Sequence, residues 1–397
     1  MKKKCISDVP DEVLKGKRVL VRVDFNVPLD KERNITDDTR IRASLPTINY
    51  LIDKGSKIIL MSHLGRPEGK PNPQFSLDVV AKRLSELLGK DVMFLPDCVG
   101  KEVKEKVATL KGGEVALLEN VRFHKEEKKN DESFAKELAS LGEVYVNDAF
   151  AASHRKHASV VGVAKFLPAY AGFLVAKEIE VLSSLLESPE SPFMAILGGA
   201  KVSDKIGVII NLMDKVTSIL IGGGMSYTFL KSQGYEIGDS LLEEDKIEMA
   251  KKILEDAQKK GIKILLPLDI VVADKFAEDA NVQIVDAKNI PSGWMGMDIG
   301  PKTIELFKSE LKNAKTVFWN GPLGVFEMEK FSNGTNSIAK FLGELDAVTV
   351  IGGGDSASAV RKAGVADKMT HISTGGGASL EFLEKGTLPG IEVLEDK

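Results

Sequence analysis

One stretch of the sequence decides the fold, Met194-Ala195-Ile196-Leu197-Gly198-Gly199-Ala200-Lys201. Its first four residues are all apolar, whereas a strand with one face in solvent would alternate apolar and polar residues. A short continuous apolar run indicates a strand that is buried on both faces, as in a parallel sheet. The stretch therefore predicts a buried strand that ends at a pair of glycines.

Similar apolar runs recur along the chain, with helical patterns between them. The runs are Val19-Leu20-Val21, Ile58-Ile59-Leu60, Val115-Ala116-Leu117-Leu118, Val144-Tyr145-Val146, Met194-Ala195-Ile196-Leu197, Ile219-Leu220-Ile221, Ile264-Leu265-Leu266, Val317-Phe318 and Val348-Thr349-Val350-Ile351. Residues 77–88 exemplify the intervening pattern, because their apolar side chains fall on one helical stripe. Strands that alternate with helices predict the α/β class in a doubly wound arrangement.

The composition is that of a globular protein with two domains. At roughly 100–200 residues per domain, 397 residues are enough for two. Apolar residues make up 43% and charged residues 28%, which excludes a mainly disordered chain. The 54 Lys and Arg against 58 Asp and Glu give a net charge of -4, so no positive surplus attracts a nucleic acid.

Nothing in the sequence predicts a membrane-bound or secreted protein. The longest stretch without a charge, residues 216–230, has 15 residues, whereas a membrane span needs about 20. The basic start of the chain lacks the apolar core of a signal peptide. The only cysteines, Cys5 and Cys98, are too few and too far apart for a metal knuckle or disulfide framework. We therefore expect a cytoplasmic protein.

The distribution of glycine divides the chain into two halves. Residues 1–187 hold 11 of the 36 glycines, and residues 188–397 hold the other 25. Between the halves, residues 171–186 show a helical pattern that is ended by Ser188-Pro189. We expect the connection between two domains in this helix.

In an open parallel sheet, ligands bind beyond the carboxyl ends of the strands. Cationic side chains gather near the predicted strand ends of the first half, namely Arg22, Arg40, His63, Arg66, Arg122, His154 and Arg155. Because guanidinium groups bind phosphate and carboxylate bidentately, this group predicts a site for a small, strongly anionic ligand. For any one of these residues, a surface ion pair is the alternative interpretation.

In the second half, the predicted strands end at glycines. These ends are Gly198-Gly199, Gly222-Gly223-Gly224, Asn320-Gly321-Pro322, Gly352-Gly353-Gly354 and Gly375-Gly376-Gly377. Glycine lets backbone N–H groups approach phosphate oxygens at a helix N-terminus. A single glycine triplet is more often a tight turn, but five such ends in one half predict a nucleotide site.

Three charged residues beside these glycines are candidates for binding the phosphates and their metal. Lys201 and Lys205 are one helical turn apart, so they either reach one phosphate chain together or lie on an exposed helix face. Asp355 opens a predicted helix, where a carboxylate either caps the N-terminus or holds Mg²⁺ on a nucleotide.

Two common motifs are missing and a third is weak. The sequence has neither the Gly-x4-Gly-Lys-Ser/Thr P-loop nor the Gly-x-Ser-x-Gly nucleophile motif. Residues 352–357 fit the pattern of an NAD-dependent dehydrogenase, but the acidic ribose partner expected about 20 residues later is missing. An NAD-dependent dehydrogenase and a non-catalytic nucleotide-binding protein stay open as alternatives.

Seven specific motifs occur in order along the chain. They are Arg22-Val23-Asp24-Phe25-Asn26-Val27-Pro28, Ser62-His63-Leu64-Gly65-Arg66-Pro67, Glu119-Asn120-Val121-Arg122-Phe123, Val146-Asn147-Asp148-Ala149-Phe150, Leu197-Gly198-Gly199-Ala200-Lys201-Val202, Trp319-Asn320-Gly321-Pro322 and Ser373-Thr374-Gly375-Gly376-Gly377-Ala378-Ser379. With these motifs the sequence closely resembles the phosphoglycerate kinase family. The resemblance implies two Rossmann-like, three-layer αβα domains with parallel sheets. It also implies reversible, in-line phosphoryl transfer between 1,3-bisphosphoglycerate and Mg-ADP, which gives 3-phosphoglycerate and ATP.

The same resemblance implies how the domains and the site residues are distributed. Residues 1–170 are expected to bind 3-phosphoglycerate, 171–187 to form a hinge helix, 188–377 to bind the nucleotide, and about 378–397 to return to the first domain. The implied 3-phosphoglycerate site comprises Asp24, Phe25, Asn26, Arg40, His63, Leu64, Gly65, Arg66, Arg122, His154 and Arg155. The implied nucleotide site comprises Lys205, Gly296, Asn320, Glu327, Gly353, Gly354, Asp355 and Ser356, with Asp355 also serving Mg²⁺. The groups expected around the transferring phosphoryl group are Arg40, Lys201, Gly375 and Gly376.

The chemistry of this reaction sets further expectations. The acceptor in the ATP-consuming direction is a carboxylate, and a pKa of about 4 leaves it ionised at pH 7. No general base is then needed, so we expect His63 and His154 to bind substrate rather than remove protons. Because the two ligand sets lie in different halves, we expect domain closure, with Glu178 and His371 as candidate linking residues from the family pattern. We also expect a monomer whose partners are small molecules.

Overall fold

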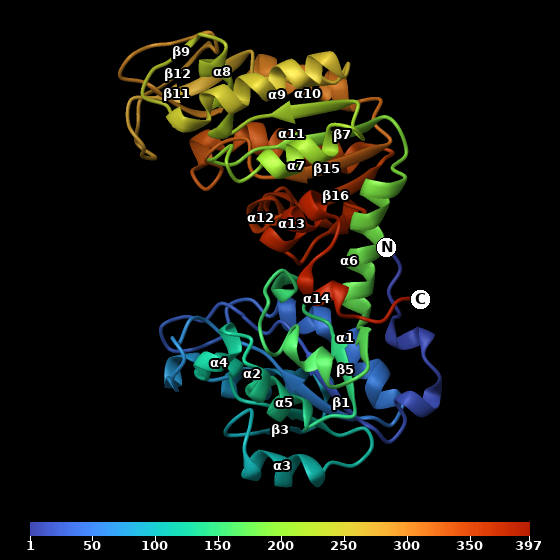
Figure 1. Ribbon diagram of the computed structural model, residues 1–397. Coiled ribbons are helices and arrows are strands. Elements are labelled where there is room, and N and C mark those ends of the chain that lie inside the picture. The colour runs from blue at the N-terminus through green and yellow to red at the C-terminus, as the bar shows by residue number, and fades with distance from the viewer. The chain divides into compact units, whose positions relative to one another are not determined.

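The structure, a computed structural model that describes residues 1–397, divides into two compact units (Figure 1). Unit 1 comprises Met1–Glu180 and Thr387–Lys397, and unit 2 comprises Val181–Gly386. The boundary at Glu180 falls inside one continuous helix, α6 (Phe173–Glu187). A single helix therefore supplies residues to both units.

Unit 1 contains a sheet of six parallel strands in the order β3-β4-β2-β1-β5-β6. The strands are β1 (Arg18–Arg22), β2 (Lys57–Met61), β3 (Val92–Phe94), β4 (Val115–Leu117), β5 (Val144–Asn147) and β6 (Ala169–Ala171). In the centre of the sheet, Val19 pairs with Ile58 on one side and with Val144 on the other. All three residues are buried, as expected for strands covered on both faces.

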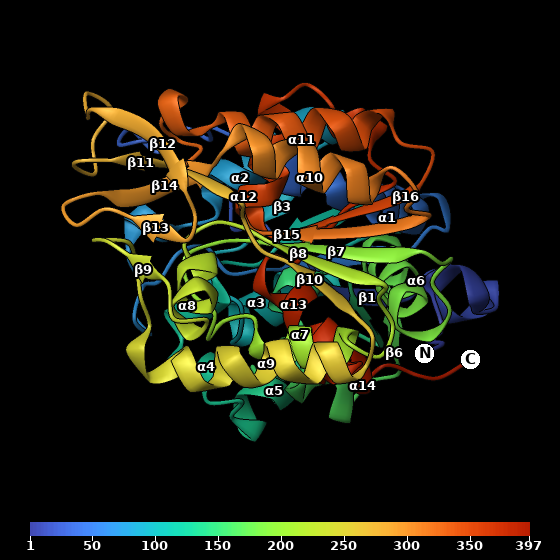
Figure 2. The same cartoon turned by 90° about the horizontal axis from the view of Figure 1, so that it is seen from above.

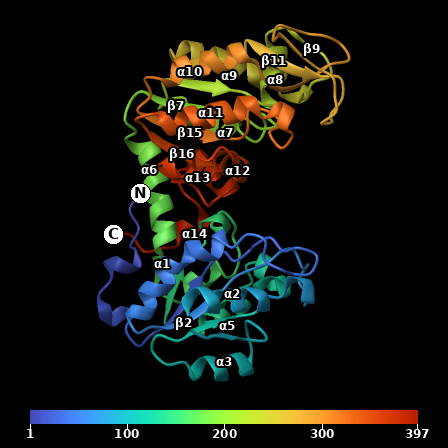
Figure 3. The ribbon, with the colours of Figure 1, turned by 180° about the vertical axis from the view of Figure 1, so that it is seen from behind.

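Helices flank this sheet and supply the rest of the core of unit 1. They are α1 (Thr39–Asp53), α2 (Asp78–Leu88), α3 (Lys101–Ala108), α4 (Lys125–Lys128), α5 (Glu132–Ala139) and α14 (Pro389–Glu392). Val19 and Val21 of β1 share one apolar cluster with Ile48 of α1 and Leu84 of α2. Figure 3 shows helices α1 and α2 beside each other in this unit. The apolar stripe predicted for residues 77–88 is thus the buried face of α2.

Both chain termini lie in unit 1 and pair with each other. Lys4 N donates to Glu395 O at 2.8 Å, and Lys3 Nζ lies 2.8 Å from Asp396 Oδ1. Asn147, the last residue of β5, donates from Nδ2 to Gly390 O at 3.0 Å. The C-terminal segment is therefore attached to the carboxyl end of a central strand.

Unit 2 contains a second sheet of six parallel strands, in the order β10-β8-β7-β15-β16-β17. The strands are β7 (Phe193–Leu197), β8 (Ser218–Ile221), β10 (Lys263–Leu265), β15 (Thr316–Asn320), β16 (Val348–Gly352) and β17 (His371–Ile372). The run Met194–Leu197 lies in β7 near the middle of the sheet, with β8 on one side and β15 on the other.

Helices cover both faces of this sheet. They are α7 (Ile206–Leu212), α8 (Met225–Ser232), α9 (Ile247–Lys259), α10 (Pro301–Leu311), α11 (Asn333–Glu344), α12 (Gly354–Lys362) and α13 (Gly377–Lys385). Figure 2 shows α10 and α11 on one side of the strands and α7, α8 and α9 on the other. One apolar cluster joins Ile196 and Trp319 of the strands to Phe307 of α10 and Ile338 of α11.

Unit 2 also has a smaller antiparallel sheet that the sequence analysis did not predict. Its order is β12-β11-β14, with β11 (Asp269–Ala273), β12 (Val282–Asp286) and β14 (Met295–Ile299). The short strands β9 (Glu236–Ile237) and β13 (Asn289–Ile290) pair beside it. Most of β12 is exposed, so it lacks the continuous apolar run that marked the buried strands.

The predicted fold class is confirmed, and each of the nine apolar runs overlaps a strand. The boundaries predicted at residues 170, 187 and 377 lie elsewhere than the unit boundaries at Glu180 and Gly386. In particular, α13 belongs to unit 2, where Asn211 Nδ2 of α7 donates to Leu383 O. None of the helices combines the length and the apolar character that a membrane span requires.

Candidate functional site

In unit 1, cationic and amide side chains follow the strands at one edge of the sheet. Parallel strands end at the same edge, so the segments after β1, β2, β4 and β5 meet there. Those segments carry Asp24, His63, Arg122 and His154, and the first turn of α1 adds Arg40. The expected convergence of these segments follows from the strand order.

Asp24 and Arg40 form an ion pair within this group. Arg40 Nη1 donates to both carboxylate oxygens of Asp24 at 3.1 Å and to Asn26 O at 3.2 Å. Asn26 Oδ1 in turn accepts from Gly65 N at 2.9 Å. The Arg40 side chain is 42% exposed, so its guanidinium group is accessible to a ligand while its position is fixed.

Two buried basic side chains, Arg122 and His63, lie beside this pair, where burial and neighbouring arginines disfavour positive charge. Arg122 is 7% exposed and donates from Nη1 to Gly65 O at 3.0 Å. Burial, followed by the charges of Arg22 and Arg155, lowers the pKa of Arg122 to about 10. Burial and then the same Arg22 charge lower the pKa of His63 well below its usual value. An anion placed here would relieve this repulsion, so the group has the electrostatics of an anion site.

The remaining predicted residues of unit 1 differ in how exposed they are at this edge of the sheet. Arg66 and Arg155 are exposed and His154 is half-buried. Phe25 and Leu64 are 0% and 2% exposed, so neither residue offers a ligand an accessible surface. The Phe25 amide already donates to Ser62 Oγ at 2.9 Å.

Arg22 is the only cation of the predicted group that is completely buried. Its side chain is 0% exposed. Its three guanidinium nitrogens contact Ser159 Oγ, Val23 O and His63 Nδ1 at 2.5–2.9 Å. The expectation that Arg22 contacts the ligand is wrong, because every nitrogen is already bonded inside the protein.

In unit 2, the glycine-rich strand ends surround a polar cavity of about 270 Å³. The lining includes Lys201, Lys205, Asn320, Gly353, Gly354, Asp355, Ser356, Gly376 and Gly377. Helices α12 and α13 begin at this cavity, at Gly354 and Gly377. Their N-terminal N–H groups and dipoles favour an anion there, which fits a phosphate chain.

The backbone around this cavity requires glycine at Gly353. Its φ of +93° is in the region that side chains rarely adopt, and an added Cβ would lie 2.9 Å from Asn320 Nδ2. Asn320 Nδ2 also donates to Gly352 O at 2.8 Å, and Ser356 Oγ accepts from Gly321 N at 2.7 Å. These bonds hold the loop after β16 against the loop after β15.

Two lysines supply positive charge to the cavity in different ways. Lys201 is exposed at the rim, whereas Lys205 is 7% exposed and donates from Nζ to Asn320 Oδ1. Burial lowers the pKa of Lys205 to about 8, against the raising effect of Asp204 and Asp355. A buried ammonium group that is this destabilised would gain from a phosphate beside it.

A second cavity of about 540 Å³ shares Gly199, Ala200, Pro322 and Asp355 with the first. Apolar side chains dominate its wall, namely Tyr227, Leu241, Phe276, Met295, Met297 and Val325. The predicted residues Gly296 and Glu327 also line it. A Cβ at Gly296 would lie 2.2 Å from Tyr227 Oη, so only glycine leaves this wall flat. The two cavities together suit a molecule with a polyanionic end and a flat apolar end.

The sequence analysis missed the apolar residues of this second cavity. Leu241 and Phe276 are 59% and 62% exposed, which is unusual for large apolar side chains. Phe276 was visible as a lone aromatic residue within the charged stretch 274–279. Neither residue follows one of the predicted strands, and the strand-end reasoning therefore passed over them.

The implied Mg²⁺ fits the residues present. The carboxylate of Asp355 is exposed where the two cavities join, and carboxylate oxygens are ligands that Mg²⁺ prefers. Gly375, by contrast, is not part of either cavity wall, and its N–H donates to Ser373 Oγ at 3.1 Å. Of the two glycines expected near the transferring group, the structure brings Gly376 to the cavity.

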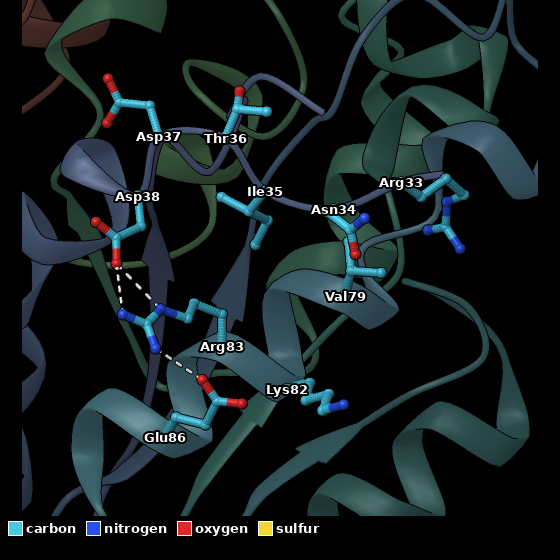
Figure 4. Close-up of a pocket in the computed structure, with 10 residues that line it drawn as sticks. All are labelled: Arg33, Asn34, Ile35, Thr36, Asp37, Asp38, Val79, Lys82, Arg83 and Glu86. Carbon is cyan, nitrogen blue, oxygen red and sulfur yellow. Dashed lines mark hydrogen bonds and ion pairs between the residues drawn. The ribbon is translucent and has the colours of Figure 1, made fainter. Parts of the chain in front are cut away.

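A larger cavity in unit 1, about 670 Å³, lies among α2 and residues 33–38 and contains none of the predicted site residues (Figure 4). Arg83 binds Asp38 at 2.9 Å and Glu86 at 2.7 Å across it. Arg33 pairs with Asp78 at 2.5 Å. Two of the three cations that line this cavity, Arg33 and Arg83, thus already have carboxylate partners.

Comparisons with known proteins point to one family. The model of the family "Phosphoglycerate kinase" matches residues 7–386. The chain is 60% identical to the phosphoglycerate kinase of Dictyoglomus turgidum, with 100% of both chains covered. It is 58% identical to the cytosolic phosphoglycerate kinase of Triticum aestivum over 99% of both chains. Among solved structures, it is similar to phosphoglycerate kinase from Coxiella burnetii, with a TM-score of 0.89, 41% identity and 98% of both chains covered.

Proposed function

This chain belongs to the phosphoglycerate kinase family, and on that premise we propose which of its residues carry the reaction. The enzyme transfers a phosphoryl group reversibly between 1,3-bisphosphoglycerate and ADP, a step of glycolysis. This family membership sets aside the NAD-dependent dehydrogenase and the non-catalytic nucleotide-binding protein as alternatives.

The proposed 3-phosphoglycerate site is the cationic edge of unit 1. Arg40 and Arg122 bind the phosphate and carboxylate groups of the substrate, with Arg66, Arg155 and His154 at the rim. His63 and Asn26 offer hydrogen bonds to the uncharged part of the molecule, and Asp24 accepts from its hydroxyl group. The observation that carries this assignment is the convergence of basic side chains from several strand ends and from α1 at one edge of the sheet, where an anion would offset their positive charge.

The proposed nucleotide site is the pair of joined cavities in unit 2. The phosphates bind at the N-termini of α12 and α13, beside Lys201 and Lys205. The base lies in the apolar second cavity against Gly296, and Glu327 accepts from a ribose hydroxyl. Asp355 holds the Mg²⁺ of the nucleotide, and that ion supplies neutralisation of the phosphate charge.

Transfer then depends on position and charge. The acceptor carboxylate is ionised at neutral pH and needs no base. Arg40, Lys201 and the N–H groups around Gly376 stabilise the charge on the equatorial oxygens of the phosphoryl group as it passes in line. Neither a phosphoenzyme nor a proton transfer is required in this mechanism.

The two proposed sites belong to different units, so we infer that the units close during the reaction. Glu178 and His371 are the proposed linking residues of this closure. We also propose that the protein is a cytoplasmic monomer. Its two buried cysteines are free thiols, and the wheat relative is named as cytosolic.

Calorimetric titration with each substrate separately tests which unit binds which substrate. Arg122→Ala is expected to weaken 3-phosphoglycerate binding by roughly tenfold or more, as for loss of a hydrogen-bonded charge, and to leave ADP binding unchanged. Lys205→Met is expected to weaken ADP binding and to leave 3-phosphoglycerate binding unchanged. If either variant weakened both ligands equally while the protein stayed folded, the assignment would be wrong.

A further inference from the structure

Beneath the cationic edge of unit 1 lies a buried chain of four side chains, Glu127, Ser159, Arg22 and His63. The first three are 0% exposed and His63 is 6% exposed. Glu127 comes from α4, and Ser159 comes from the segment that follows the proposed rim residue Arg155. Neither Glu127 nor Ser159 takes part in the proposed mechanism, although burying a carboxylate is costly unless it is paired.

The hydrogen bonds of this chain are continuous. Ser159 donates to Glu127 twice, from N to Oε1 at 2.7 Å and from Oγ to Oε2 at 2.5 Å. Arg22 Nε donates to Ser159 Oγ at 2.8 Å, so this hydroxyl group accepts a hydrogen bond from Arg22 and donates one to Glu127. Arg22 Nη2 lies 2.9 Å from His63 Nδ1.

The last contact decides which nitrogen of His63 carries its proton. A guanidinium group stays protonated and has only donors, so Arg22 Nη2 must donate and His63 Nδ1 must accept. The imidazole is then neutral, with its hydrogen on Nε2. Burial and the neighbouring arginines also lower the pKa of His63, which agrees with a ring that stays neutral. A ring in this state presents a donor and has no nitrogen left to act as a base.

The rest of the chain fixes the position of Arg22. The guanidinium group is buried, and its nearest carboxylate along these bonds is Glu127, reached through the hydroxyl of Ser159. Tyr145 Oη adds support by donating to Ser159 O and Val160 O, both at 3.1 Å. Removal of the Ser159 hydroxyl would leave both Arg22 Nε and one Glu127 oxygen without a buried partner.

We propose that Glu127 and Ser159 are positioning residues for phosphoryl transfer. Through Arg22 they hold His63 as the neutral Nε2–H tautomer, so that His63 donates one hydrogen bond of fixed direction to 3-phosphoglycerate. This inference rests on the substrate-binding role proposed for His63.

The tautomer can be measured directly by NMR on the full chain with ¹⁵N-labelled histidine. The chain has 5 histidines, so His63 is assigned as the signal that His63→Gln removes. We expect Nδ1 at an acceptor shift and Nε2 at a protonated shift in the parent. Ser159→Ala and Glu127→Gln are expected to give a mixture of tautomers or exchange broadening of this one ring.

Kinetics then separate positioning from general destabilisation. Ser159→Ala is expected to raise KM for 3-phosphoglycerate roughly tenfold, with KM for Mg-ATP unchanged. The matched control is Ser56→Ala, which removes another buried hydroxyl of unit 1, one that donates to Leu14 O at 2.8 Å. Ser56→Ala is expected to change neither KM nor the His63 signal.

These NMR and kinetic measurements have defined outcomes that would overturn the inference. A proton on Nδ1 of His63 in the parent would overturn the inference, and so would a Ser159→Ala variant with parent tautomer and parent KM. If His63→Gln itself left KM for 3-phosphoglycerate unchanged, the proposed substrate role of His63 would fail, whatever the NMR signal of the ring showed.

Discussion

The buried ammonium group of Lys205 predicts that nucleotide affinity depends on pH. Burial lowers the pKa of this group to about 8, from an ordinary value of 10.5. In the free enzyme, about 90% of Lys205 is then protonated at pH 7 and about 10% at pH 9. A bound phosphate chain stabilises the protonated form and returns the pKa toward its ordinary value. Binding of ADP above pH 8 is therefore coupled to uptake of one proton.

The size of the effect follows from these fractions. Because the binding-competent fraction falls about tenfold between pH 7 and pH 9, Kd for ADP is expected to rise about tenfold over that range. Isothermal titration calorimetry gives Kd, and repetition in buffers of different ionisation enthalpy counts the protons taken up.

Two variants isolate the group responsible. Lys205→Met is expected to bind ADP more weakly at pH 7 and to lose the dependence between pH 7 and pH 9. Lys201→Met removes an exposed lysine of the same cavity and is expected to keep the dependence. A parent Kd that is flat from pH 7 to pH 9, or an unchanged slope in Lys205→Met, would refute the reasoning.

Three further predictions concern backbone, acid stability and the surface. Gly353→Ala is expected to lower the free energy of unfolding by about 1–2 kcal/mol, because its φ of +93° is unfavourable for alanine; Gly354→Ala, where an added Cβ meets open space, should show no loss in the same urea titration. The pKa of His157 is lowered to about 3 by burial and then by Arg122, below its unfolded value of 6.5. Its stabilisation is complete above pH 6.5 and is lost as the pH falls toward 3, so the parent should lose about 2 kcal/mol more than His157→Gln between pH 7 and pH 4.5. Arg83→Ala breaks one exposed and one partly buried ion pair and is expected to cost about 1 kcal/mol without changing turnover. A loss of activity would point to a role for the cavity in Figure 4.

Much of the fold could be predicted because its strands are buried on both faces. A run such as Ile58–Leu60 is typical of a strand that is buried on both faces, and each of the nine runs overlaps a strand. The antiparallel sheet was missed because β12 is mostly exposed and β14, Met-Gly-Met-Asp-Ile, has no continuous apolar run. A continuous apolar run in the sequence indicates a strand that is buried on both faces. Strands β12 and β14 are buried only in part, so they have no such run.

The predicted sites show the same limit. Strand ends marked by cations or glycines could be found, because parallel strands bring their carboxyl ends to one edge. Arg22 was grouped with the ligand-facing cations because sequence gives no direction for a side chain at the end of β1. Leu241 and Phe276 were missed because both lie in loops, where an exposed apolar residue leaves no local signature.

The central claim is that one reaction needs a cationic group in unit 1 and another in unit 2. It is tested most directly by measuring ADP formation from Mg-ATP and 3-phosphoglycerate in the parent, in Arg40→Ala and in Lys201→Ala, with the exposed Lys104→Ala as the control. We predict turnover in the parent and in Lys104→Ala, and a loss of roughly 10²–10³ in kcat in each of the other two variants. Full activity in folded Arg40→Ala or Lys201→Ala would contradict the account.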